Sequence, residues 1–140
     1  MPIREKVFAY VTRITDGRPE LLVFASHDEP GFEVPEGAVE VGETPAEAVH
    51  REMEEEAGIA GARIVRILGA ADWQDERQHF LLVEAPPGLP RSFVHTVTGD
   101  GFDAGLRYRF RWIPIDGDLG ERLVQGCDRF VDALRAAMEA

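Results

Sequence analysis

The segment between Thr44 and Gly58 constrains this chain most, because it carries the signals for both ends of a helix. Thr44 can cap the helix, Pro45 suits the first helical position, and Glu47 completes a capping box. Gly58 suits the left-handed position that follows the last turn. We therefore predict a helix that runs to about Ala57.

The predicted helix has two faces of different chemistry. Three glutamates stand at positions i, i+3 and i+4, so their carboxylates share one face: Glu52, Glu55 and Glu56. An apolar stripe lies about a quarter turn or more away and is expected to face the core. The stripe consists of Ala46, Val49, Met53 and Ala57.

The region around this helix is strongly acidic. All nine acidic residues between Glu33 and Glu56 are glutamates, and Arg51 is the sole base there. A charge run usually forms a solvated helix face. However, like charges at these spacings destabilise a helix by roughly 0.2–0.5 kcal/mol per pair, which argues for a compensating cation. A hard divalent cation such as Mg²⁺ takes oxygen ligands and is usually completed by substrate phosphates, so the spacing indicates metal-assisted phosphate chemistry.

Composition excludes several classes of protein. The 140 residues suit one domain, which we place over residues 1–140. A net charge of −11 disfavours a protein that coats DNA or RNA, although a bound divalent cation can invert the field locally. The single cysteine, Cys127, allows neither an intrachain disulfide nor a cysteine zinc cluster. No apolar run approaches the roughly 20 residues of a membrane helix, and the start lacks a secretory signal, so we expect no membrane partner and a cytoplasmic location.

The remaining segments predict strands, a second helix and two loops. β-rich runs at 7–11 and 21–24 flank a turn signal at Asp16-Gly17 and indicate a hairpin. The apolar residues between Leu119 and Met138 have the spacing of an amphipathic helix packed on a sheet. These elements together indicate an α+β or α/β sandwich. Further strands are expected at 32–34, 38–41, 62–72, 78–85 and 106–115, and loops at 86–90 and 98–105.

The segment from Gly37 to Ile59 resembles the Nudix box at every defining position. Five residues separate Gly37 from Glu43, and seven more precede the run Arg51-Glu52-Met53-Glu54-Glu55-Glu56-Ala57-Gly58-Ile59. So many specified positions at fixed spacing make a chance match very improbable. The resemblance implies an α+β Nudix fold, a mixed β-sheet sandwiched between α-helices. It also implies a hydrolase of phosphoric anhydride bonds that cleaves a nucleoside diphosphate linked to another moiety.

The resemblance also assigns a metal site. It implies that Glu52, Glu55 and Glu56 hold Mg²⁺, with Mn²⁺ as the alternative ion, and that the backbone carbonyl of Glu36 is a further ligand. It implies that Arg51 orients the glutamates. The alternative for Arg51 is a surface ion pair with Glu55 at i, i+4.

Three more residues of the box have supporting roles in this interpretation. Glu43 lies at the junction of loop and helix and supports the box. Gly37 allows the tight path of the loop, and Gly58 ends the helix.

The general base is left open. Nudix enzymes use either a box glutamate or an acidic residue from a downstream loop, where this chain has Asp100 and Asp103. These two aspartates could equally be ordinary Asp-Gly turn residues.

Substrate contacts outside the box are less specific. Trp73 could stack on a base, although a tryptophan at a strand end is more often part of the core. Arg107, Arg109 and Arg111 alternate along one strand with the aromatic residues Tyr108, Phe110 and Trp112. We expect the aromatic face of this strand to be core and the arginines to lie on the surface. Arg109 is the candidate to bind a phosphate away from the metal.

The leading functional hypothesis is therefore an enzyme, a magnesium-dependent pyrophosphohydrolase of a small nucleotide derivative. Two alternatives remain open: a Nudix-fold nucleotide-binding or regulatory module without catalysis, and an RNA 5′-end pyrophosphohydrolase. Binding modules typically lose box glutamates, whereas this chain keeps them. The negative charge disfavours a long RNA. A monomer or a homodimer is expected.

Overall fold

Along the chain, two groups of four strands are separated by a helix, and two short helices follow the second group. The computed structural model describes residues 3–139. In chain order the elements are β1 (Arg4–Thr15), β2 (Arg18–Ala25), β3 (Phe32–Glu33), β4 (Glu36–Ala38), α1 (Pro45–Ala57), β5 (Arg63–Trp73), β6 (Glu76–Glu84), β7 (Ser92–Thr96), β8 (Arg107–Pro114), α2 (Leu119–Arg122) and α3 (Val131–Glu139).

Strand β1 is the centre of the sheet and has different neighbours at its two ends. Its second half pairs antiparallel with β2 across a two-residue turn. Asp16 and Gly17 in this turn both have positive φ, which matches the right-handed twist of a hairpin. The first half of β1 pairs with β4 instead, and β6 runs parallel to it along the other edge. The β1–β2 hairpin predicted from the sequence is thus confirmed.

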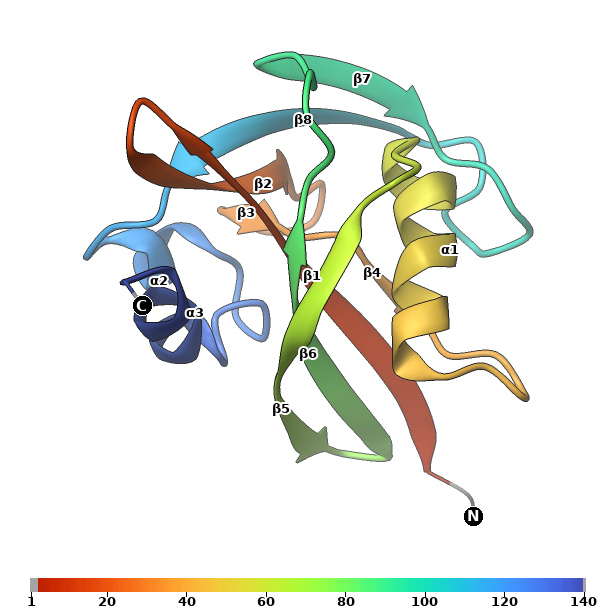
Figure 1. The fold of residues 1–140 in the computed structure, drawn as a ribbon. Coiled ribbons are helices and arrows are strands. Elements are labelled where there is room, and N and C mark those ends of the chain that lie inside the picture. The colour runs from red at the N-terminus through yellow and green to blue at the C-terminus, as the bar shows by residue number, and fades with distance from the viewer. Residues whose placement is uncertain (1–2, 140) are drawn as a thin grey trace.

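The sheet is mixed and lies between helices. The strand order is β5-β6-β1-β2-β8-β7, with β3 added to β2 and β4 added to β1. Figure 1 shows α1 on one side of this sheet and α2 and α3 on the other. This arrangement confirms the predicted α+β class and the sandwich of a mixed sheet between helices.

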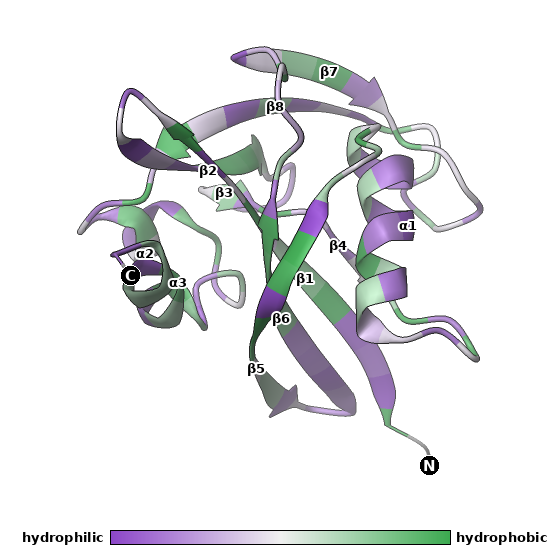
Figure 2. Cartoon of the chain, in the orientation of Figure 1, coloured by the Kyte–Doolittle hydropathy of each residue, from purple (hydrophilic) through white to green (hydrophobic). Residues whose placement is uncertain are grey.

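Each face of the sheet has its own buried core. Val49 and Met53 of α1 pack with Val7 and Leu81 in the core beneath α1. The opposite core brings α2 and α3 onto the other face, with Tyr10 among its buried residues. Figure 2 shows hydrophilic bands along the exposed side of α1. The apolar stripe of α1 is therefore buried as predicted, and it fixes which side of the helix faces outward.

The chain departs from the predicted elements at three places. The segment 119–138 forms two short helices instead of one, because Gly126 has a positive φ and the chain between α2 and α3 is made of turns. The strand expected at 38–41 lies earlier, as β4. Strand β7 was not predicted, and it adds to β8 at the end of the sheet.

Two further expectations concern the whole chain. Within residues 3–139, no helix is long and apolar enough to span a bilayer. The extent of a single domain over residues 1–140 stays a prediction.

Candidate active site

Helix α1 is held at both ends by the groups that the sequence predicted. The Thr44 hydroxyl accepts a hydrogen bond from the Glu47 amide, and the Glu47 carboxylate accepts one from the Thr44 amide. Gly58 has a φ of 70° and donates its amide to the last turn. These caps fix where along the chain the glutamate face begins and ends.

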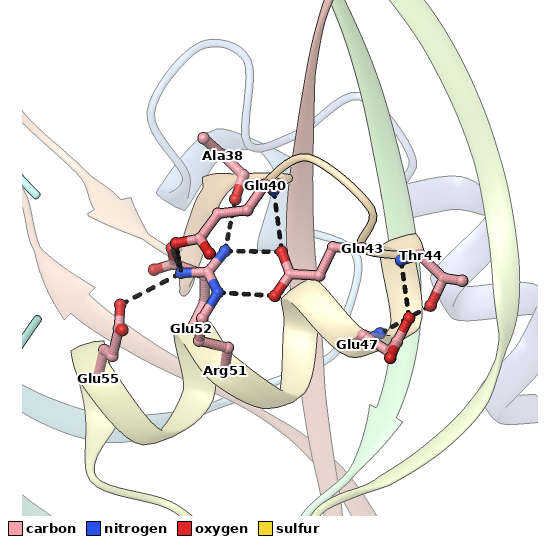
Figure 3. A network of polar contacts seen from close by, with 8 residues as sticks. All are labelled: Ala38, Glu40, Glu43, Thr44, Glu47, Arg51, Glu52 and Glu55. Carbon is pink, nitrogen blue, oxygen red and sulfur yellow. Dashed lines mark hydrogen bonds and ion pairs between the residues drawn. The ribbon is translucent and has the colours of Figure 1, made fainter.

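Arg51 is the centre of a polar network on this face (Figure 3). Its Nε and Nη2 donate to the two carboxylate oxygens of Glu43 at 2.8 and 2.9 Å, a bidentate pair. Its Nη1 donates to Glu52 at 2.8 Å and to Glu55 at 3.3 Å, while Nη2 also donates to the carbonyl oxygen of Ala38 at 2.7 Å. The expected i, i+4 pair with Glu55 is therefore only one of several contacts, and Arg51 ties α1 to the end of β4.

Strand β4 passes very close to the glutamate face. A Cβ on Gly37 would lie 2.1 Å from Cδ of Glu52, so any side chain here would displace the Glu52 carboxylate from its present position. The Glu36 amide donates to Oε1 of Glu56 at 3.1 Å. Glu56 is 4% exposed, and Glu36 carries its own carboxylate into the same region. The box glycine thus brings backbone donors and acceptors of β4 up to the carboxylates.

The loop between β7 and β8 closes the other side of the site. The Thr98 amide donates to the carbonyl oxygen of Glu55 at 2.9 Å, and Nε2 of His95 lies 3.0 Å from the same oxygen. Gly99 has a φ of 91°, and a Cβ there would lie 2.8 Å from the Glu55 carboxylate. These contacts place the segment that carries Asp100 and Asp103 beside the C-terminal half of α1.

A cavity of about 650 Å³ lies between these elements. Acidic side chains outnumber basic ones around it. Its acidic residues are Glu5, Asp28, Glu33, Glu36, Glu40, Glu52, Glu55, Glu56, Glu76, Asp100 and Asp103, and its basic residues are Arg4, Lys6 and Arg51. A volume of this size suits a small-molecule ligand, and the charge calls for additional cations if that ligand is an anion.

Burial raises the pKa of several carboxylates in this cavity. Burial, together with the nearby carboxylates of Glu36 and Asp103, raises the pKa of Glu56 to about 10, against the opposing hydrogen bond from the Glu36 amide. Burial also raises the pKa of Glu52 to about 7, against the opposing effect of Arg51. The pKa of Glu36 is raised for the same reason, although Lys6 opposes it. Burial is the largest cause of all three shifts, so each of these carboxylates needs a compensating cation to remain ionised.

The donor set fits a hard divalent cation. Every group offered at this place is a carboxylate or backbone carbonyl oxygen, which Mg²⁺ and Mn²⁺ prefer. Within residues 3–139, no three acidic, histidine or cysteine side chains form a ready-made metal cluster. Arg51 instead bridges Glu52 and Glu55. A bound cation would neutralise part of the negative charge of Glu52 and Glu55 that Arg51 now neutralises.

The predicted site residues fall into two groups. Glu36, Gly37, Arg51, Glu52, Glu55, Glu56, Asp100 and Asp103 all line the cavity. Glu43 supports Arg51 from outside it. Trp73 and Arg109 do not line it. Trp73 is 49% exposed at the end of β5, where the Arg129 guanidinium lies 5.9 Å from its ring, so it is neither a core residue nor a cavity residue.

Tyr108 lines the cavity although its alternation with arginines indicated a core position. Its ring stacks on Phe24 with centroids 4.3 Å apart, which accounts for the alternation. Burial and the carboxylates of Asp103 and Glu56 raise the pKa of Tyr108. The aromatic face of β8 therefore forms part of the core and part of the cavity wall, a distinction that periodicity does not make.

Comparison with known proteins settles the family. The model of the NUDIX domain matches residues 4–116, which include β1 to β8 and the whole of α1. The chain belongs to the Nudix family. This membership confirms the resemblance that the box indicated.

The proteins that this chain resembles carry the names of several hydrolases. An RNA pyrophosphohydrolase of Cereibacter sphaeroides is 41% identical over 58 residues, which cover 39% of this chain and 36% of the relative, so the match spans about a third of that relative. The fold resembles a C. elegans Ap4A hydrolase, with a TM-score of 0.67, 17% identity and 99% of each chain covered. It also resembles an ADP-ribose pyrophosphatase of Streptococcus suis, with a TM-score of 0.63, 16% identity and coverage of 99% of this chain and 91% of the other. At these identities the solved structures establish the fold alone.

Proposed function

We propose that this Nudix protein is a divalent-metal-dependent pyrophosphohydrolase that cleaves a nucleoside diphosphate linked to another moiety. The observation that carries the proposal is the position of Glu56. Its carboxylate is buried beside those of Glu36 and Asp103, and nothing but a backbone amide donates to it among the described residues. A buried carboxylate of this kind is stabilised as an anion by a cation.

The protein residues divide the work of the reaction. Glu52, Glu55 and Glu56 would hold Mg²⁺ or Mn²⁺ together with the carbonyl of Glu36, and the ion would neutralise the pyrophosphate and acidify water. Arg51 orients Glu52 and Glu55 through the contacts described above. Gly37 leaves room for the Glu52 carboxylate.

The proton of the attacking water goes to one of the carboxylates that face the cavity. Two classes of base remain: a box glutamate, or Asp100 or Asp103 from the loop between β7 and β8. Each lies on the wall of the same cavity, so both classes satisfy the requirement that a base lies near the reacting groups. Separate Asp100→Asn and Asp103→Asn variants distinguish them by the loss of kcat.

A panel of nucleotides tests the proposal. Purified protein with Mg²⁺ is incubated with ADP-ribose, a dinucleoside polyphosphate, a nucleoside diphosphate sugar and nucleoside triphosphates, and the products are identified. The proposal expects cleavage of a phosphoric anhydride in at least one compound. A folded protein that cleaves none of them would be the non-catalytic module that the sequence left as an alternative.

A second candidate, an RNA 5′-end pyrophosphohydrolase, is favoured by the local identity with the Cereibacter sphaeroides relative. The net charge of −11 disfavours binding of a long RNA. A short 5′-triphosphorylated RNA in the same panel decides this point. Release of pyrophosphate from it, faster than cleavage of every small nucleotide, would favour the second candidate.

A further inference from the structure

Lys6 is the only lysine in the chain, and it lines the cavity. It lies on β1, opposite Ala38 of β4 on one side and Gln78 of β6 on the other. Because β1 is a central strand of the sheet, the backbone of Lys6 is fixed on both sides. Its side chain is 29% exposed, so the ammonium group lies partly out of solvent.

Lys6 also connects to the carboxylates of the site. Its Nζ donates to Oε1 of Glu36 at 3.0 Å, and the Glu36 amide donates to Glu56 at 3.1 Å. Glu36 therefore links the two groups: its carboxylate contacts the Lys6 ammonium, and its backbone amide contacts the buried carboxylate of Glu56. Burial alone would lower the pKa of Lys6, but the charge and hydrogen bond of Glu36 more than offset this and raise it.

The three basic residues of the cavity are not equally free to meet a ligand. The Arg51 guanidinium donates to Glu43, Glu52, Glu55 and the Ala38 carbonyl. Arg4 is 72% exposed and pairs with Glu76. Lys6 has three N–H donors, and Glu36 is its only hydrogen-bond partner among residues 3–139. Two donors of a half-buried ammonium therefore remain for a bound group.

We propose that Lys6 is a substrate-binding residue whose remaining donors bind the phosphate of the substrate. The inference rests on the proposed function, because it assigns an anionic substrate to the same cavity. A cavity with so many carboxylates needs a cation wherever the substrate is negatively charged. An ammonium is a compact charge whose N–H donors can reorient. It can therefore keep its hydrogen bond to Glu36 while it donates to a phosphate oxygen. In the absence of substrate, the Glu36 carboxylate balances the charge of the Lys6 ammonium.

Selective labelling tests the proposal without turnover. Protein made with ¹³C-labelled lysine has one labelled side chain, so its Cε–Hε correlation reports on Lys6 alone. The spectrum is recorded with Ca²⁺ or Mg²⁺ alone and then with inorganic pyrophosphate added. We expect a saturable shift of the Lys6 resonance on addition of pyrophosphate. A resonance that responds to the metal and not to pyrophosphate would overturn the proposal and leave Lys6 as a partner of Glu36 only.

Kinetics provide the second arm of the test. Lys6→Met should raise KM about tenfold, the value of one charge-assisted hydrogen bond, with kcat within about threefold of the wild type. Lys6→Arg should recover part of the loss. Arg63→Gln, which removes a positive charge from an exposed pair with Glu84 on the sheet edge, is the matched control and should leave KM unchanged.

The two arms separate failure of this inference from failure of the proposed function. An active wild type with an unchanged KM in Lys6→Met would contradict the role of Lys6 and leave the hydrolase intact. A wild type that cleaves no nucleotide would contradict the proposed function, and the labelled spectrum would still decide whether Lys6 meets a phosphate. Circular dichroism of both Lys6 variants confirms that they fold.

Discussion

The Cα of Gly37 lies so close to Glu52 that a Cβ there would meet the carboxylate carbon at 2.1 Å. This approach joins β4 to α1 at the point where the carboxylates gather. Gly37 does not have a positive φ, so the requirement for glycine is one of space and not of backbone conformation.

Gly37→Ala should therefore displace the Glu52 carboxylate and reduce activity more than stability. The new Cβ would meet only the end of a flexible side chain, so the free energy of unfolding should fall by less than the cost of about 1–3 kcal/mol that is typical of a methyl group inserted into a packed core. Chemical denaturation and kcat measure the two effects. Gly117→Ala is the matched control, because a Cβ at Gly117 has open space and this glycine also lacks a positive φ. Equal behaviour of the two variants would remove the steric argument.

Glu56→Gln should abolish most of the activity and stabilise the metal-free protein. The amide oxygen can still accept from the Glu36 amide, while the free-energy cost of keeping a buried carboxyl protonated at neutral pH is lost. We expect kcat to fall at least about a hundredfold, as for loss of a metal ligand worth several kcal/mol. Thermal unfolding in EDTA should show a higher Tm. Glu54→Gln, an exposed glutamate on the same helix, should change neither value.

Arg51→Lys should weaken the site although it keeps the charge. An ammonium cannot make the bidentate pair with Glu43 and also reach Glu52 and the Ala38 carbonyl. Loss of an orienting partner typically reduces metal affinity or activity by about 10- to 100-fold. Glu43→Gln should cause a loss of similar kind. The double variant Arg51→Lys, Glu43→Gln tests whether the two residues act together. If the losses of activity of the single variants, expressed as free energies, simply add in it, the two residues act independently and the network has no joint role.

The metal-free protein should become less stable as the pH rises. The pKa of Glu52 is about 7 and that of Glu56 about 10 in the folded state, against an ordinary value of 4.5. Between pH 4.5 and these values the folded state holds protons that the unfolded state has released, so stability falls with rising pH. Denaturation in EDTA at pH 5, 7 and 9 measures this slope. Glu56→Gln should flatten it, and Mg²⁺ should oppose it. A slope of opposite sign would contradict the assignment.

Local sequence signals predict the part of the site that lies on α1. The remainder of the site depends on contacts between residues far apart in the sequence. The caps of α1 and the spacing of its glutamates depend on residues within one helical turn of each other, so sequence alone predicted them. The contact of Gly99 with Glu55 and the hydrogen bond from Thr98 depend on how the loop between β7 and β8 folds back, which no local pattern records. The sequence did not predict the break between α2 and α3. The apolar residues there recur at helical spacing, although the chain turns at Gly126, which has a positive φ.

The aromatic residues show the same limit. Trp73 was expected to be a core residue at a strand end, with base stacking as the alternative, yet it is exposed and does not line the cavity. Tyr108 looked like a core residue and instead lines the cavity. Periodicity indicates which face of a strand a side chain occupies. It does not indicate whether that face is covered by a helix or opens into a cavity at that point.

The central claim is that the acidic face of α1 and the Glu36 region form a metal site that cleaves a phosphoric anhydride. The most direct measurement is ³¹P NMR of the best substrate of the panel, incubated with wild-type protein in Mg²⁺ and in EDTA, and with Glu56→Gln in Mg²⁺. We predict that the anhydride resonances are replaced by those of phosphate monoesters only for the wild type in Mg²⁺. Equal cleavage in EDTA, or by the Glu56→Gln variant, would contradict it.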